Sequence, residues 1–246
     1  MYRTSNPALN DEVFSKQPAL ANEPVMTLQG TVNKTFILTT LLAVAGSFGW
    51  KVAESGSPLT MPVMIGGGIL ALILVIVSCF KPQWAPAIAP SYAILKGAAI
   101  GIISFTYNAR FNGIVLQAAL LTLGILFALL LAYQSRMIRA TENFKLGIVA
   151  ATGGIFLFYL VTLVLGFFGV SVPLVAGNGV WAIGFSVFVV IIAALNLVLD
   201  FDFIENGVEM RAAKYMEWQA ALGLLVTLVW LYIEILRLLA KLRSRD

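Results

Sequence analysis

Seven long apolar stretches cover almost the whole chain after residue 34, and they limit its fold more than any other feature. They lie at about residues 35–53, 60–80, 84–106, 113–134, 146–169, 178–200 and 217–240. Each stretch is close to the roughly 20 residues that a helix needs to cross a bilayer. The sequence therefore predicts an all-α integral membrane protein with seven spans.

The composition agrees with a membrane protein and excludes several classes of function. Of the 246 residues, 60 % are hydrophobic and 11 % are charged, which is too apolar for a soluble domain of this length. The chain has no histidine, so it holds no histidine-based triad and no zinc site built with histidine. Its single cysteine, Cys79, forms no intrachain disulfide. With no serine elbow and no phosphate-binding loop either, we expect a protein that is not an enzyme.

The basic residues predict a topology. The net charge of +4 comes from Lys and Arg in the tails and in short loops beside the spans, so we expect no nucleic-acid partner. Nine of these residues fall on the side of the N-terminus and two on the other side, which predicts a cytoplasmic N-terminus. Four more follow Glu234, so the last stretch either crosses against this bias or is shallow or re-entrant. We expect residues 1–30 to form a mobile cytoplasmic tail, and residues 31–242 the membrane domain.

Ionisable groups at or near membrane depth are few, and they are the candidate functional residues. Asn196 and Asp200 lie one helical turn apart in the sixth stretch, and Asp202 follows. Their hard oxygen atoms are the ligands that Ca²⁺ prefers, although these acids have an alternative interpretation as the end of a helix in the headgroup region. Lys96, at the centre of the third stretch, needs a buried partner, for which Asp200 and Glu234 are the candidates.

Glu234 in the seventh stretch has two interpretations of its own. Arg237 follows it by three residues, the spacing of a local ion pair on a helix. Alternatively, Glu234 turns inward while Arg237 extends to the membrane surface. Small residues in two other stretches, Gly66 to Gly68 and Gly97 to Gly101, predict close packing between helices.

Several segments, in their order along the chain, resemble the bacterial branch of the Bax inhibitor (transmembrane Bax-inhibitor-motif) family. They are TLQGTVNKT, APSYAILKGAAIGIIS, FNGIVLQAALLT, LNLVLDFDFIENG and KYMEWQAALGLLVTLVWLYIEILRLL. The resemblance implies a seven-helix bundle with a central last helix in a bacterial inner membrane. It also implies a pH-sensitive calcium leak gated by two acids, which match Asp200 and Glu234 here. Where the family commonly has Glu, this chain has Lys96, which weakens the attraction of cations at that point.

The sequence thus favours a cation leak channel or sensor that responds to protons and is gated by acids of the last two spans. Its expected partners are membrane lipid, protons and cations, with Ca²⁺ as the one possible bound ion. The alternative is a non-conducting protein that modulates a membrane protease or another membrane protein complex through its N-terminal tail. An intramembrane enzyme would need an aspartyl mechanism that uses Asp200 with another acid.

Overall fold

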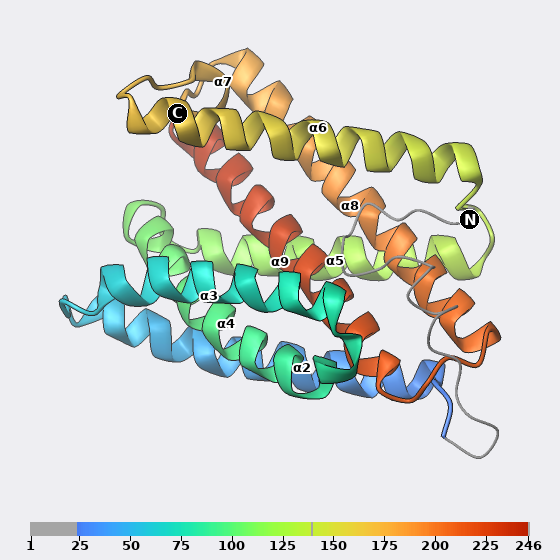
Figure 1. Cartoon of the computed structure of the whole chain (residues 1–246). Helices are drawn as coiled ribbons and strands as arrows, with labels where there is room; N and C mark the ends of the chain where they lie inside the picture. Colours follow the sequence, from blue (N-terminus) through green and yellow to red (C-terminus); the bar gives the residue numbers. More distant parts are fainter. Residues whose placement is uncertain (1–23, 139, 246) are drawn as a thin grey trace. The chain divides into compact units, whose positions relative to one another are not determined.

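The computed structural model describes residues 24–138 and 140–245, and in these residues the chain is almost entirely helical (Figure 1). The elements are α2 (Leu28–Glu54), α3 (Thr60–Phe80), η1 (Pro82–Trp84), α4 (Ala85–Arg110), α5 (Ile114–Gln134), α6 (Glu142–Phe167), α7 (Pro173–Ala176), α8 (Val180–Glu209) and α9 (Met216–Arg243). Seven of these helices are long and apolar enough to cross a membrane, with η1 leading directly into the span of α4. The prediction of an all-α, seven-span membrane protein is confirmed.

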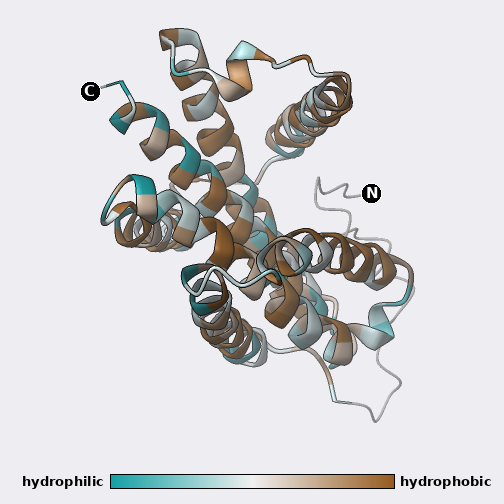
Figure 2. Cartoon of the chain, turned by 90° about the vertical axis from the view of Figure 1, so that its left-hand side faces the viewer, coloured by the Kyte–Doolittle hydropathy of each residue, from teal (hydrophilic) through white to brown (hydrophobic). Residues whose placement is uncertain are grey.

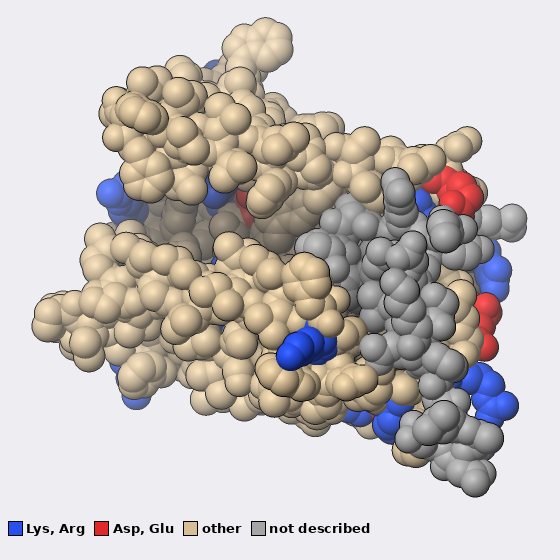
Figure 3. All heavy atoms as spheres, in the orientation of Figure 1, with Lys and Arg blue, Asp and Glu red and all other residues tan. Residues whose placement is uncertain are grey.

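The surface is that of a membrane protein. Apolar residues dominate the long helices in Figure 2. On the face that Figure 3 shows, charged side chains are few, and most of the described surface is formed by other residues. The spans differ in how much of them is buried. In an 18-residue apolar stretch of α9, 61 % is buried, against 11 % in the corresponding stretches of α2 and α6. The last helix is therefore the most enclosed span, as expected for the central helix of a bundle.

Two helix boundaries differ most from the predicted ones. Helix α2 begins seven residues before the predicted start at residue 35, because the side chain of Thr27 accepts a hydrogen bond from the backbone N–H of Gly30 and caps the first turn. The predicted tail boundary at residue 30 thus lies inside a helix, and residues 1–23 are outside the described part of the chain. Helix α8 continues past Asp200 to Glu209, so Asp200 does not end the helix as the alternative interpretation required.

The first of two compact units comprises, among the described residues, 24–110 and 200–226. In this unit α4 packs against both α2 and α3. Close approach depends on glycine, because a Cβ atom at Gly97 or Gly101 would collide with the backbone of Leu42 or Gly46 on α2. The small residues of the third stretch are therefore packing residues, as predicted. The first part of α9 completes the core through Ala221, Leu222 and Leu225.

The second unit comprises the described residues of 111–199 and 227–245. Its core forms where Ile155 of α6 meets Val189 and Ile192 of α8, and Trp230 of α9 packs against this cluster. Aromatic rings add to it, since Phe158 and Phe185 lie 4.9 Å apart between ring centroids. This unit contains the last part of α9.

Each end of α9 is held by contacts within its own unit. In the first unit, Glu217 at its start binds Thr27 and Lys34 near the start of α2. In the second unit, Arg243 at its end donates to the carbonyl of Asn112, in the turn that joins α4 to α5. Helix α9 is long and apolar enough to cross a membrane fully, and the side on which it ends stays a prediction.

Candidate functional site

Asp200 lies in the most enclosed part of α8. Its side chain is 1 % exposed, and all six residues from Asn196 to Phe201 are buried. Since one helical turn takes 3.6 residues, six consecutive buried residues mean that α8 is covered on all sides here. An ionised carboxylate in such a place is costly, which makes Asp200 a candidate functional residue.

The two other candidate residues on α8, Asn196 and Asp202, form hydrogen bonds of their own. The side-chain amide of Asn196 donates to the hydroxyl of Thr152 on α6 at 2.9 Å and to the carbonyl of Ile192 at 2.8 Å. Asp202 is only partly buried, and it accepts a hydrogen bond from the side chain of Asn206 at 3.0 Å. Of the three candidate ligands on α8, Asp200 is therefore the buried carboxylate, whereas Asp202 belongs to the outer part of the helix.

Glu234 is buried and paired in the second unit. Its side chain is 2 % exposed, and both carboxylate oxygens lie 3.1 Å from Nη1 of Arg237. The hydroxyl of Tyr159, on α6, lies 3.1 and 3.2 Å from the same two oxygens and also accepts a hydrogen bond of 2.7 Å from Arg237. The guanidinium carbon of Arg237 is 5.2 Å from the centre of the Tyr159 ring. The local ion pair expected from the spacing is confirmed, and Tyr159 is a member that the sequence did not indicate.

Lys96 lies on α4 in the first unit and is partly buried. Its ammonium forms no hydrogen bond or ion pair with the described residues, and its pairing with Asp200 or Glu234 stays a prediction. Asp200 belongs to the first unit and Glu234 to the second. Their convergence on one site also stays a prediction. No group of three or more Asp, Glu or Cys side chains among the described residues could hold a metal ion, and the chain has no histidine.

A second buried acid, Glu217, forms a polar cluster that sequence reasoning missed. Its side chain is 0 % exposed and is bound by Lys34 of α2 and, at 2.7 Å, by Lys214. The backbone N–H and the hydroxyl of Thr27 donate to its Oε1 at 2.9 and 2.8 Å. Gly30 leaves the space for this carboxylate, because a Cβ there would overlap it. We call these five residues the Glu217 cluster.

The Glu217 cluster ties the chain before α2 to the turn before α9. The N–H of Met26 donates to the carbonyl of Ala212 at 2.7 Å, and the N–H of Lys214 donates to that of Pro24 at 3.1 Å. The segment Pro24 to Thr27 is therefore hydrogen-bonded to the residues around the start of α9. A signal for part of this was present in the sequence: Thr27 is a preferred helix-capping residue directly before the first turn of α2.

These features define a multi-pass helical membrane protein with carboxylates buried in its last two spans. The chain matches the family model described as Bax inhibitor 1 like over residues 6–244, and it therefore belongs to that family. A comparison with curated proteins found no match. The resemblance noted in the sequence is thus confirmed at the level of the family.

Proposed function

We infer that this protein is a pH-sensitive cation leak or sensor, with Ca²⁺ as its ion, gated by the acids of α8 and α9. The observation that carries this proposal is the burial of Asp200 at 1 % exposure, where α8 is covered on all sides. Membership of the Bax inhibitor family supports it. The proposed setting is a bacterial inner membrane with the N-terminus in the cytoplasm, as the resemblance and the Lys and Arg count indicate.

The gating argument follows from the cost of a buried charge. A proton or a cation on the Asp200 carboxylate lowers the cost of enclosing it, whereas the ionised form favours a conformation that admits water. The proton therefore has different affinities for an enclosed and a hydrated state, which is the requirement for a shift between two populations. Ca²⁺ is the substrate that would pass through the hydrated state, with carboxylate oxygens as its ligands.

Glu234 contributes through its pair with Arg237. In the structure its two oxygens are occupied by Arg237 and Tyr159, so Glu234 would take part in cation passage only after this pair opens. Replacing Glu234 with Gln removes the charge that holds Arg237 and should favour the open pair. We expect Glu234→Gln to change the rate of flux, and Asp200→Asn to change its dependence on pH.

The test is Ca²⁺ entry into liposomes that contain the purified protein and a trapped calcium dye, measured from pH 5 to 8. Wild-type flux should vary with pH, and Asp200→Asn should remove most of this variation because asparagine carries no titrating charge. Glu205→Gln is the matched control: Glu205 is exposed on the same helix, and its replacement should leave the profile unchanged. Absence of Ca²⁺ flux at every pH, or an unaltered profile in Asp200→Asn, would overturn the proposal.

A further inference from the structure

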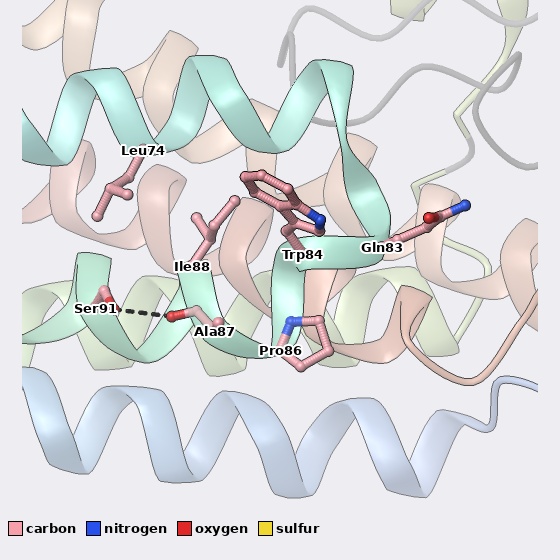
Figure 4. Close-up of a pocket in the computed structure, with 7 residues that line it drawn as sticks. All are labelled: Leu74, Gln83, Trp84, Pro86, Ala87, Ile88 and Ser91. Atoms are coloured by element: carbon pink, nitrogen blue, oxygen red, sulfur yellow. Dashed lines mark hydrogen bonds between the residues drawn. The ribbon is translucent and has the colours of Figure 1, made fainter.

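An apolar groove lies between α3 and α4 at the end where η1 joins them. It has a volume of about 520 Å³, and its walls include Leu74 of α3 and Trp84, Ile88 and Ser91 of the η1–α4 segment. In Figure 4, Leu74 and Ile88 point toward each other from the two helices, and the Trp84 ring lies at the same level nearer the turn. This volume is in the ordinary range of about 300–1,000 Å³ for small-molecule sites.

A smaller polar cavity continues the groove at the turn. Its volume is about 240 Å³, and it shares Gln83 and Trp84 with the groove, with Phe80, Lys81 and Pro82 completing its lining. The ammonium of Lys81 lies 4.4 Å from the centre of the Trp84 ring. This cation–π contact holds a positive charge at the mouth of the groove. Together the two cavities form a groove that is apolar along its wide part and positively charged at one end.

The local sequence explains both parts. Helix α3 ends at Phe80, and the turn of Pro82 to Trp84 reverses the chain into α4. The small side chain of Ala87 leaves the groove open, since a larger residue there would fill it. The hydroxyl of Ser91 is turned back onto the carbonyl of Ala87 at 2.9 Å (Figure 4), so the groove wall stays apolar below its mouth.

We propose that this groove binds an anionic phospholipid, with an acyl chain along Leu74, Ile88 and Ala87 and the phosphate at Lys81 and Gln83. The argument is one of charge and depth. The groove lies at the ends of two spans, where lipid headgroups lie and where tryptophan is enriched at the membrane surface. A lysine at this depth attracts anionic headgroups, and a phosphate accepts from both the ammonium and the side-chain amide.

A phospholipid fits this groove better than a water-soluble ligand would. The wide part is apolar and opens on the outer surface of α3 and α4, where Trp84 and Ala87 are exposed. In a bilayer that surface faces acyl chains, so a lipid reaches the groove without leaving the membrane. Its headgroup then lies at the one end of the groove that has a cation.

The experiment uses quenching of Trp84 fluorescence by lipids brominated on their acyl chains. The full-length protein is reconstituted with brominated phosphatidylglycerol or brominated phosphatidylcholine, and the signal of Trp84→Phe is subtracted to isolate Trp84 from the other four tryptophans. We expect anionic lipid to reach half-maximal quenching at about fivefold lower mole fraction, the effect of one lysine at a membrane surface. Equal quenching by the two lipids, or no quenching of Trp84 by either, as when another protein segment covers the groove, would overturn the proposal.

Two variants separate the headgroup from the acyl chain. Lys81→Gln should abolish the anionic preference, whereas Lys51→Gln, an exposed lysine in the last turn of α2, should retain it. Ala87→Phe should reduce the quenching by both lipids, because the ring fills the groove. Helical circular dichroism and an unchanged unfolding midpoint verify that each variant is folded. Retention of the full preference in Lys81→Gln would refute the assignment of the phosphate site.

Discussion

The Glu217 cluster provides the sharpest test of how polar contacts hold this fold together. In Glu217→Gln the two Thr27 donors keep an acceptor, since the amide oxygen replaces Oε1. The change removes the charge that Lys34 and Lys214 share, and it replaces Oε2, the acceptor for Lys34, with an NH2 group that cannot accept. The perturbation therefore separates the lysine contacts of the cluster from its hydrogen bonds to Thr27.

The magnitude follows from how exposed each partner is. The side chain of Lys34 is 16 % exposed, and losing a charged hydrogen bond in such a place costs about 2–3 kcal/mol. The side chain of Lys214 is 45 % exposed, so its pair contributes only about 0.5 kcal/mol. We expect Glu217→Gln to lower the free energy of unfolding by about 3 kcal/mol. Lys34→Met should approach this loss, and Lys214→Met should lie near wild type.

The assay is equilibrium unfolding of the purified protein in mixed detergent micelles. Helical circular dichroism reports the whole chain, and Trp218 fluorescence reports the cluster, because the ammonium of Lys34 lies 5.4 Å from the centre of its ring. Equal losses in Lys34→Met and Lys214→Met would show that burial does not set the strength of these pairs. A wild-type stability for Glu217→Gln would refute the reasoning altogether.

Two further predictions use the same unfolding assay. Gly101→Ala should lower the free energy of unfolding by about 1–3 kcal/mol, because its Cβ would overlap the backbone of Gly46. The Cβ of Gly68→Ala enters open space, so this variant should be neutral or slightly stabilising. Losses of equal size in the two variants would contradict the packing argument. Tyr159→Phe should lower the free energy of unfolding by about 1–2 kcal/mol, because it removes the hydroxyl that links Glu234 and Arg237. Tyr107→Phe should cost much less, since the Tyr107 hydroxyl bonds none of the described residues. Equal costs would mean that the Tyr159 link contributes nothing.

The sequence predicted the spans well because length and hydropathy alone determine them. A helix satisfies its own backbone groups, so an apolar stretch of about 20 residues has essentially one solution in a membrane. The boundaries failed where tertiary contacts extend a helix. Glu217 holds Thr27 at the start of α2, and burial continues along α8 through Phe203 and Ile204, beyond the predicted end of the sixth span at residue 200.

Prediction of the candidate site succeeded only where the contact was local. Glu234 and Arg237 are three residues apart, and their pair could be inferred from helical spacing. Tyr159 is 75 residues from Glu234, and Lys34 is 183 residues from Glu217, so no spacing rule connects them. A polar side chain has many possible partners along the sequence, and only the tertiary structure determines which of them it contacts.

The basic residues near the C-terminus, which complicate the topology count, have partners in the fold. The positive-inside rule counts Lys and Arg in loops and near span ends as free charges. Here Arg237 is paired with Glu234, and Lys241 is buried, where it donates to the carbonyls of Leu174 and Ala182 and to the hydroxyl of Ser186. Arg243 is likewise bound, to Asn112 and Gln117. Arg237, Lys241 and Arg243 therefore all have partners within the second unit, which distinguishes them from the basic residues of an unbound tail.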